Sequence, residues 1–205
     1  MKLVVLDFDG VLFERHRTVD NPPPNPDFTH KYFSYYIYPG VHQFIQSLLE
    51  KYDVGFLTSI TEKNTLPILR KLYANKEIPK FKFILDRRFV KHDPEYKKFE
   101  KINFYDTIKL LSDIHLSSTI NLNRVYNTHN TIIIDDSYMK MRFNHPKNVI
   151  LFTPIVKQNF YVGYNYRSGY LKKWPEHQYT KLSSYEEILN YITSIGHNKI
   201  DWKKK

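Results

Sequence analysis

Two aspartates near the amino end of the chain, Asp7 and Asp9, directly follow an apolar run from Leu3 to Leu6. Such a run is typical of a strand that is buried on both faces of a parallel sheet. Because side chains two apart on a strand point the same way, both carboxylates are expected at the strand's carboxyl end, where open α/β sheets bind ligands. Two acids this close repel each other unless a cation or a shared proton relieves them. The simplest relief is a hard divalent metal ion, which prefers oxygen ligands.

Two further apolar runs also end in reactive side chains. The run 54–57 is followed by Thr58 and Ser59, and the run 131–134 is followed by Asp135 and Asp136. A hydroxyl or an acid at a single strand end often only caps the next helix. Three such strands in one parallel sheet place their carboxyl ends on the same edge, which favours a single site. Adjacent acids on an extended strand point to opposite faces, so one of the last pair is expected to meet a metal and the other to anchor a lysine.

These residue types fit phosphoryl transfer. A carboxylate can attack phosphorus and form an aspartyl phosphate. A second acid two residues on can protonate the leaving oxygen and then activate water. A hydroxyl and an ammonium can hold the phosphoryl oxygens, and Mg²⁺ would offset the repulsion between the carboxylates and the phosphate.

The elements that must position these side chains alternate between strands and helices. This pattern predicts an α/β fold, a three-layer Rossmann-like parallel sheet with helices on its faces. Further strands are expected at 81–85 and 148–152. Helices are expected at 41–51 and 62–75, from the start Asp93-Pro94-Glu95, at 106–114 with Asp106 as cap, and from a capping box at Ser183–Glu186 to Gly196.

The composition is that of an ordinary globular protein. The 205 residues fit one domain, 1–205, with 41% apolar and 25% charged residues. The sequence contains no run of 18 apolar residues, so we expect no membrane span. The apolar segment at the amino end is too short, and is followed by too many acids, for a signal peptide. The absence of cysteine excludes disulfides and suits a reducing compartment. We therefore expect an intracellular protein of the cytoplasm or nucleus with no membrane partner.

The net charge and two unusual segments bear on partners. A formal charge of +10 favours anionic partners, nucleic acid or phosphorylated protein, unless it reflects compositional bias alone. Within a C-terminal extension at about 154–205, residues 158–181 mix aromatic and basic side chains, as in a single-strand nucleic-acid surface or a packed extension. Residues 13–38, rich in proline and aromatics, predict a short flap in place of a full cap domain. A lightly covered site suits a macromolecular substrate, although these aromatics could simply pack on the core.

Several motifs resemble a known superfamily. The segment Asp7-Phe-Asp-Gly-Val-Leu12 resembles the first motif of the haloacid dehalogenase (HAD) superfamily, 56–59 its second and 132–137 its fourth. A narrower similarity, over about residues 1–152, is to FCP/SCP-type (NLI-interacting-factor-like) phosphatases, which dephosphorylate Ser/Thr, notably in the RNA polymerase II C-terminal repeat. It is carried by Tyr38-Pro-Gly-Val-His-Gln-Phe-Ile45, 52–59, 130–137 and 143–148.

The resemblance implies a HAD-type fold and a Mg²⁺-dependent phosphoric monoester hydrolase that works through an aspartyl phosphate. It implies that Asp7 is the nucleophile and a Mg²⁺ ligand, and that Asp9 is the general acid and base, with its backbone carbonyl a further ligand. Thr58, with Ser59 beside it, would bind the phosphoryl group. The implied substrate is phosphoserine or phosphothreonine in a phosphoprotein.

The remaining two motifs supply the rest of the implied site. Asp136 takes the place of the metal-binding residue in the fourth motif, with Asp135 beside it. The lysine of the third motif has two candidates, because Lys109 resembles the narrower family's Lys-Asp-Leu segment and Lys91 resembles the Lys-Pro-x-Pro form of the wider superfamily. We favour Lys109, whose distance to Asp135 suits one helix and a loop, whereas Lys91 would need an insertion.

The chain also departs from the narrower pattern. Gly10 and Val11 stand where that family usually has Glu-Thr, Asp136 replaces a frequent Asn, and Lys109 is followed by Leu. These differences weaken the inferred substrate more than the inferred catalysis. The alternatives are a phosphatase acting on nucleic-acid ends, nucleotides or a small metabolite, and a non-catalytic HAD-fold binding module. The intact pair of Asp7 and Asp9 argues against the last.

Overall fold

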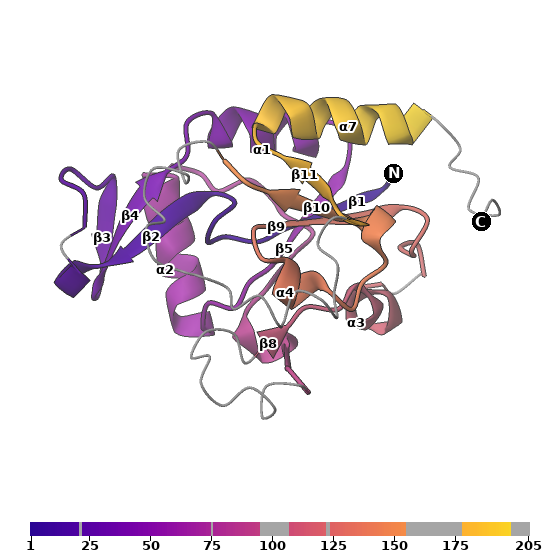
Figure 1. Ribbon diagram of the computed structural model, residues 1–205, viewed down its shortest axis with the longest axis horizontal. Helices are drawn as coiled ribbons and strands as arrows, with labels where there is room; N and C mark the ends of the chain where they lie inside the picture. The colour runs from indigo at the N-terminus through magenta and orange to yellow at the C-terminus, as the bar shows by residue number, and fades with distance from the viewer. Residues whose placement is uncertain (21, 75, 95–106, 122–123, 155–177, 198–205) are drawn as a thin grey trace.

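A computed structural model describes residues 1–20, 22–74, 76–94, 107–121, 124–154 and 178–197 (Figure 1). Its centre is a six-stranded sheet in the order β11-β10-β9-β1-β5-β6, and every pairing within it is parallel. The predicted α/β fold around a parallel sheet is therefore confirmed. The strands are β1 (Leu3–Leu6), β5 (Asp53–Leu57), β6 (Phe83–Leu85), β9 (Thr131–Asp135), β10 (Val149–Phe152) and β11 (Thr180–Leu182).

Helices cover both faces of this sheet, so that it forms the middle of three layers (Figure 1). Both faces of strand β1 are buried, which explains why its sequence is apolar throughout. Val4 and Leu6 point into one core and Leu3 and Val5 into the other, and all four are fully buried. The first core lies under α1 (Val41–Leu49), α2 (Glu62–Leu72) and α7 (Tyr185–His197), and the second lies under α3 (Leu111–Leu116) and α4 (Tyr138–Met141).

The register of the central strands brings the predicted site residues to one edge. Strand β1 lies between β5 and β9, with Leu6 opposite Phe56 on one side and Ile134 on the other. The ladder continues for one more residue, because the backbone N–H of Asp7 donates to the carbonyl of Ile134 at 3.0 Å. Asp7 therefore sits level with Asp135, the last residue of β9.

Residues after β1 form a small antiparallel sheet, which projects beside α2 in Figure 1. In this predicted flap, Tyr35 and Phe13 are buried with ring centroids 5.1 Å apart, and Phe28 stacks on Tyr35 at 4.6 Å. Part of the flap's aromatic surface thus belongs to the core, while Tyr32 remains exposed. The order is β2-β4-β3, with β2 (Phe13–Arg17), a 3₁₀ turn (Thr18–Asp20), β3 (Phe28–His30) and β4 (Phe33–Ile37).

The described part of the C-terminal extension adds to the central layers. Strand β11 pairs with β10, and α7 packs against α1. Tyr185 stacks on Phe44 and Phe152 at centroid distances of 4.3 and 5.1 Å, and its hydroxyl donates to the carbonyl of Val11 at 2.6 Å. Helix α7 therefore braces the loop that follows Asp9.

The helix predicted at 106–114 is wrong over its first half. Thr107–Ile108 form β8, which pairs antiparallel with β7 (Lys91–His92), and α3 begins only at Leu111. The N–H of Leu111 donates to Oδ1 of Asn144 at 2.8 Å, a partner 33 residues further along the chain. The local sequence therefore carried no signal for this start.

Other element ends differ by a few residues. The capping box of α7 is Ser184 with Glu187, one residue later than predicted, and the helix continues past Gly196 to His197. Of the helix predicted from Asp93, the structure describes only the first two residues. The residue Asp106 and most of 158–181 also lie outside the described residues. Among the described helices, none has the length and apolar character needed to cross a bilayer. The described residues also include 3₁₀ turns at Arg87–Phe89 and Pro146–Asn148.

Candidate active site

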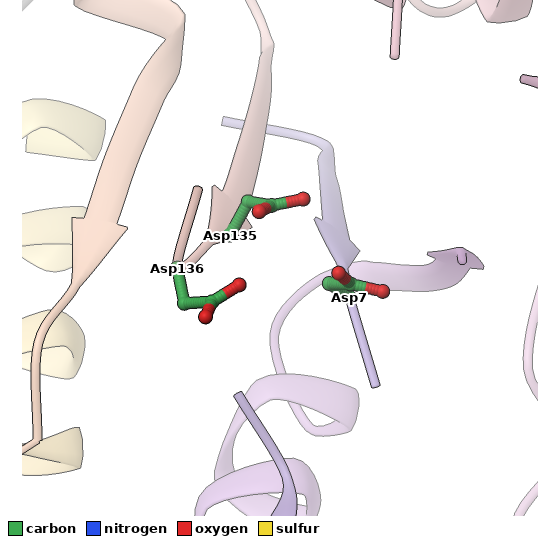
Figure 2. A group of neighbouring side chains, drawn as sticks. All are labelled: Asp7, Asp135 and Asp136. Carbon is green, nitrogen blue, oxygen red and sulfur yellow. The ribbon is translucent and has the colours of Figure 1, made fainter. Parts of the chain in front are cut away.

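Three carboxylates converge at the carboxyl edge of the sheet (Figure 2). Asp7 follows β1, Asp135 ends β9, and Asp136 comes directly after it. One carboxylate oxygen from each lies within 4.8 Å of the others. Asp7 and Asp135 are buried and Asp136 is half-buried, so the cluster is open on the side of Asp136.

Lys109 lies between two of these acids. Its side chain is fully buried, and its Nζ is 2.6 Å from Oδ2 of both Asp7 and Asp135. Burial by itself would lower the pKa of Lys109, but the two carboxylates raise it above its ordinary value, so the ammonium form is retained. The alternative residue, Lys91, is exposed and pairs with Asp113 at 2.7 Å. The structure thus brings Lys109 to the acids and leaves Lys91 outside.

Asp7 is buried yet held in its ionised form. Burial would raise the pKa of Asp7, but Lys109 and Lys140 together with the N–H of Phe8 bring it below its ordinary value. That N–H donates to Oδ1 of Asp7 at 2.7 Å. An ionised carboxylate is the form that can attack phosphorus.

Asp135 and Asp136 hold different positions, as adjacent acids on an extended strand should. Asp135 accepts hydrogen bonds from Lys109 at 2.6 Å and from the N–H of Ser137 at 2.8 Å. Burial raises the pKa of Asp135 to about 6; Lys109 opposes this shift, and repulsion from Asp7 and Asp136 adds to it. The raised pKa therefore reflects burial first, together with repulsion from the two neighbouring acids, which Lys109 and Lys140 do not fully offset.

The cluster has the character of a divalent-metal site. One carboxylate oxygen each from Asp7, Asp135 and Asp136 lies within 4.8 Å of the others, and Lys109 supplies an ammonium to only two of these acids. Three neighbouring carboxylates, two of them buried, offer the oxygen donors that a hard cation prefers. The residues present therefore fit a divalent cation, which would also relieve their mutual repulsion.

Gly10 makes room for the most open of these acids. Its φ is +81°, and a Cβ at this position would lie 2.3 Å from Cγ of Asp136. Only glycine adopts this conformation readily and also permits so close an approach. Gly10, which stands where the family pattern usually has Glu, therefore leaves the space that the side chain of Asp136 occupies.

The substitution Gly10→Ala should displace Asp136 and weaken divalent-metal binding. Gly40→Ala is a matched control, because Gly40 also has a φ of +81° but its Cβ would meet only Tyr185, at 3.8 Å. Both variants carry the same left-handed backbone strain, so their difference isolates the collision. We expect Mg²⁺ affinity, measured by isothermal titration calorimetry, to fall about 10- to 100-fold in Gly10→Ala relative to Gly40→Ala. Equal affinities would contradict this account.

The remaining predicted residues, Asp9, Thr58 and Ser59, follow the strands β1 and β5. The carboxylate of Asp9 points to the flap, where its Oδ2 lies 2.8 Å from Nη2 of Arg15. Its predicted role toward a metal therefore rests on its backbone carbonyl. Thr58 is fully buried at the end of β5, and its Oγ1 accepts from the N–H of Ile60 at 3.2 Å. Ser59 turns the other way, with its Oγ 3.4 Å from Oγ1 of Thr107.

Three residues near the acids were missed by sequence reasoning: Arg15, Lys140 and Asn144. Nζ of Lys140 lies 3.9 Å from Oδ2 of Asp7. Asn144 donates to the carbonyl of Lys109 at 2.7 Å, and the N–H of Lys109 donates to the carbonyl of Lys140 at 2.9 Å. For Lys140 a weak signal existed, since it follows Asp136 by four residues; Arg15 and Asn144 reach the site only through the fold.

A comparison with protein families identifies the family of this chain. The family model of NLI interacting factor-like phosphatases matches residues 2–161. The chain belongs to the NLI interacting factor-like phosphatase family. It is therefore a hydrolase of the phosphatase class, and the predicted resemblance to the FCP/SCP type is confirmed. Helix α7 and strand β11, which brace the sheet, lie beyond the residues matched by the family model.

One solved structure shares the fold of this chain, and two others align with it less closely. A Thermotoga maritima protein assigned as a β-phosphoglucomutase aligns with a TM-score of 0.51 and 13% identity, over 95% of this chain and 99% of that one. A variant of the fission yeast RNA polymerase II CTD phosphatase Fcp1, bound to beryllium fluoride, aligns with a TM-score of 0.46, 15% identity and 95% coverage of this chain. A second Fcp1 structure gives 0.44, 14% and 95%. The chain spans 50% and 49% of the two Fcp1 chains. A search of curated protein sequences found no match.

Proposed function

We propose that this phosphatase is a Mg²⁺-dependent phosphomonoesterase that works through an aspartyl phosphate on Asp7. The observation that carries the proposal is the buried carboxylate of Asp7, which lies against Lys109 within a cluster of three carboxylates. The substrate that we propose is phosphoserine or phosphothreonine in a protein, of the kind found in the RNA polymerase II C-terminal repeat. Family membership supports that substrate class, and an intracellular location in the cytoplasm or nucleus goes with it.

The chemistry needs two steps at one phosphorus. A carboxylate oxygen of Asp7 attacks phosphorus, the bond from phosphorus to the ester oxygen breaks, and Asp9 donates a proton to that leaving oxygen. Asp9 then takes a proton from a water molecule as this water attacks the aspartyl phosphate. The bond from Asp7 to phosphorus breaks, inorganic phosphate leaves, and both acids return to their starting states.

Neighbouring residues supply positioning and charge. Lys109 and Thr58 would bind the phosphoryl oxygens, and Asp135 holds the ammonium of Lys109 at 2.6 Å. Asp7, Asp136 and the backbone carbonyl of Asp9 would hold Mg²⁺. When bound, Mg²⁺ would neutralise part of the negative charge that the carboxylates and the phosphate bring together.

A substrate panel tests this proposal. Phosphate release should be measured from a phosphoserine peptide, a 3′-phosphorylated oligonucleotide and a generic aryl phosphate, each with Mg²⁺ and with EDTA. We expect the peptide to be hydrolysed faster than the oligonucleotide, with EDTA abolishing turnover and added Mg²⁺ restoring it. EDTA-resistant turnover would contradict the metal requirement.

The same panel distinguishes the second candidate substrate. The net charge of +10 favours a nucleic-acid end, and faster turnover of the oligonucleotide would support it. Equal, low rates on peptide and oligonucleotide would point to a small metabolite. The absence of turnover on any of the three substrates, in protein shown to be folded and loaded with Mg²⁺, would contradict the catalytic proposal itself.

A further inference from the structure

Lys140 is a second buried lysine beside the proposed nucleophile. Its side chain is 8% exposed, and its Nζ lies 3.9 Å from Oδ2 of Asp7. The same oxygen faces Nζ of Lys109 at 2.6 Å. Two buried ammonium groups thus approach one oxygen of Asp7 from different elements, Lys109 from the turn before α3 and Lys140 from α4.

Hydrogen bonds of the Lys140 backbone and contacts at both ends of α4 fix the position of Lys140. Its carbonyl accepts the N–H of Lys109 at 2.9 Å. The residue before the helix, Ser137, donates its N–H to Asp135 at 2.8 Å. At the other end of the helix, the buried Arg142 pairs with Asp93 and donates to the carbonyl of Met139 at 2.6 Å. The helix is therefore tied to both the acids and the other lysine.

Lys140 is close enough to meet a phosphoryl group on its way to Asp7. In a near-attack arrangement the reacting atoms lie roughly 3 to 3.5 Å apart. A phosphorus at that distance from Asp7 would carry its oxygens within reach of an ammonium that is 3.9 Å from Oδ2. Lys140 therefore has the distance and the charge to bind the same group as Lys109.

The charge balance of the site indicates what a second lysine would contribute. The carboxylates of Asp7, Asp135 and Asp136 outnumber the single ammonium of Lys109 by two charges, which Mg²⁺ would balance. A phosphomonoester dianion would then leave two negative charges without compensation in a largely buried site, which is costly. The ammonium of Lys140 removes one of them.

We infer that Lys140 is a further phosphoryl-binding residue, which favours dianionic phosphomonoesters. The inference rests on the proposed role of Asp7. It has a consequence that a merely structural lysine would not have, because a charge that attracts phosphate repels a nearby Mg²⁺. Loss of the ammonium should therefore weaken phosphate binding and strengthen Mg²⁺ binding.

The test compares Lys140→Met with Lys2→Met. Lys2 is exposed and precedes β1, so its substitution removes the same charge at the opposite edge of the sheet. Calorimetry measures Mg²⁺ affinity alone and then orthophosphate affinity at saturating Mg²⁺. We expect Lys140→Met to bind orthophosphate about 10- to 100-fold more weakly, as for a lost charge-assisted contact, and to bind Mg²⁺ more tightly. KM should rise more than kcat falls, and Lys2→Met should stay within about twofold of the unmodified protein on each measure.

The outcomes distinguish phosphoryl binding by Lys140 from a purely structural role. Unchanged orthophosphate affinity, or parallel losses of orthophosphate and Mg²⁺ affinity, would overturn the assignment. Lys140→Arg, which keeps the charge, should retain most of the orthophosphate affinity, and it replaces the Met variant if thermal unfolding shows that variant to be misfolded. If the unmodified protein hydrolyses no phosphomonoester but the two affinities still shift in opposite directions, the anion site stands and the proposed catalysis fails.

Discussion

The substitution Asp7→Asn is expected to abolish phosphatase activity while leaving the fold intact. Removal of a covalent nucleophile lowers kcat on the order of 10⁴-fold or more, because no other group takes over the attack. An amide is a poor nucleophile, yet it has the size of the acid and can still accept the N–H of Phe8 that Asp7 accepts at 2.7 Å. The rate of phosphate release from a generic aryl phosphate measures the loss, and thermal unfolding checks the fold.

The variant Asp9→Asn is the informative comparison. It keeps the nucleophile and removes the proton donor, which contributes about 10²- to 10⁴-fold. Its loss should be larger on a phosphoserine peptide than on an aryl phosphate, since the alkoxide of serine leaves poorly without a proton. The activity of Asp7→Asn should fall by the same factor on both substrates.

Mass spectrometry separates the two roles directly. After mixing with an aryl phosphate, Asp9→Asn should accumulate a phosphorylated protein, because water is no longer activated for the second step. Asp7→Asn should show no such adduct. Turnover by Asp7→Asn, or an adduct on it, would show that another residue is the nucleophile.

The acid half of the site could be predicted because buried parallel strands leave a plain signal. The apolar runs 3–6, 54–57 and 131–134 are uninterrupted, and parallel pairing forces their carboxyl ends together. Alternation along an extended strand also separated Asp135 from Asp136 before any geometry was known. These inferences need only local sequence and the topology of a parallel sheet.

The positions of the lysines at the site depend on contacts between residues that are distant in sequence. Lys109 was favoured over Lys91 by its sequence distance to Asp135, yet the helix assigned to Lys109 does not exist at that position, since α3 starts where Asn144 meets Leu111. Lys140 and Arg15 reach the acids from α4 and from the flap, and neither contact follows from periodicity.

The flap itself was predicted, but its strands and the last strand of the central sheet were missed for a related reason. Phe13 pairs with Ile37 across 24 residues, in an antiparallel sheet whose strands are three to five residues long. Strand β11, Thr180–Leu182, has three residues and no apolar run. Strands this short are defined by their partners more than by their own sequence.

The substitution Lys109→Met is expected to reduce both stability and activity, whereas Lys91→Met should change neither much. Lys109 is fully buried between Asp7 and Asp135, so its loss leaves two buried carboxylates without the ammonium that contacts both, at a cost of roughly 3 to 5 kcal/mol. Lys91 is 59% exposed in its pair with Asp113, and such pairs are worth about 0 to 1 kcal/mol. Methionine has nearly the length of lysine, so both variants lose charge with little change in packing.

Urea unfolding and steady-state kinetics, with and without Mg²⁺, distinguish the two contributions of Lys109. Because the uncompensated carboxylates of Lys109→Met attract a cation more strongly, Mg²⁺ should stabilise this variant more than the unmodified protein. Activity should nevertheless remain about 10²- to 10³-fold low at saturating Mg²⁺, since the cation replaces the lost charge but not the ammonium that meets the phosphoryl oxygens. Full recovery of activity with Mg²⁺ would reduce Lys109 to a structural counterion, and a larger loss of activity in Lys91→Met would reverse the assignment of the third-motif lysine.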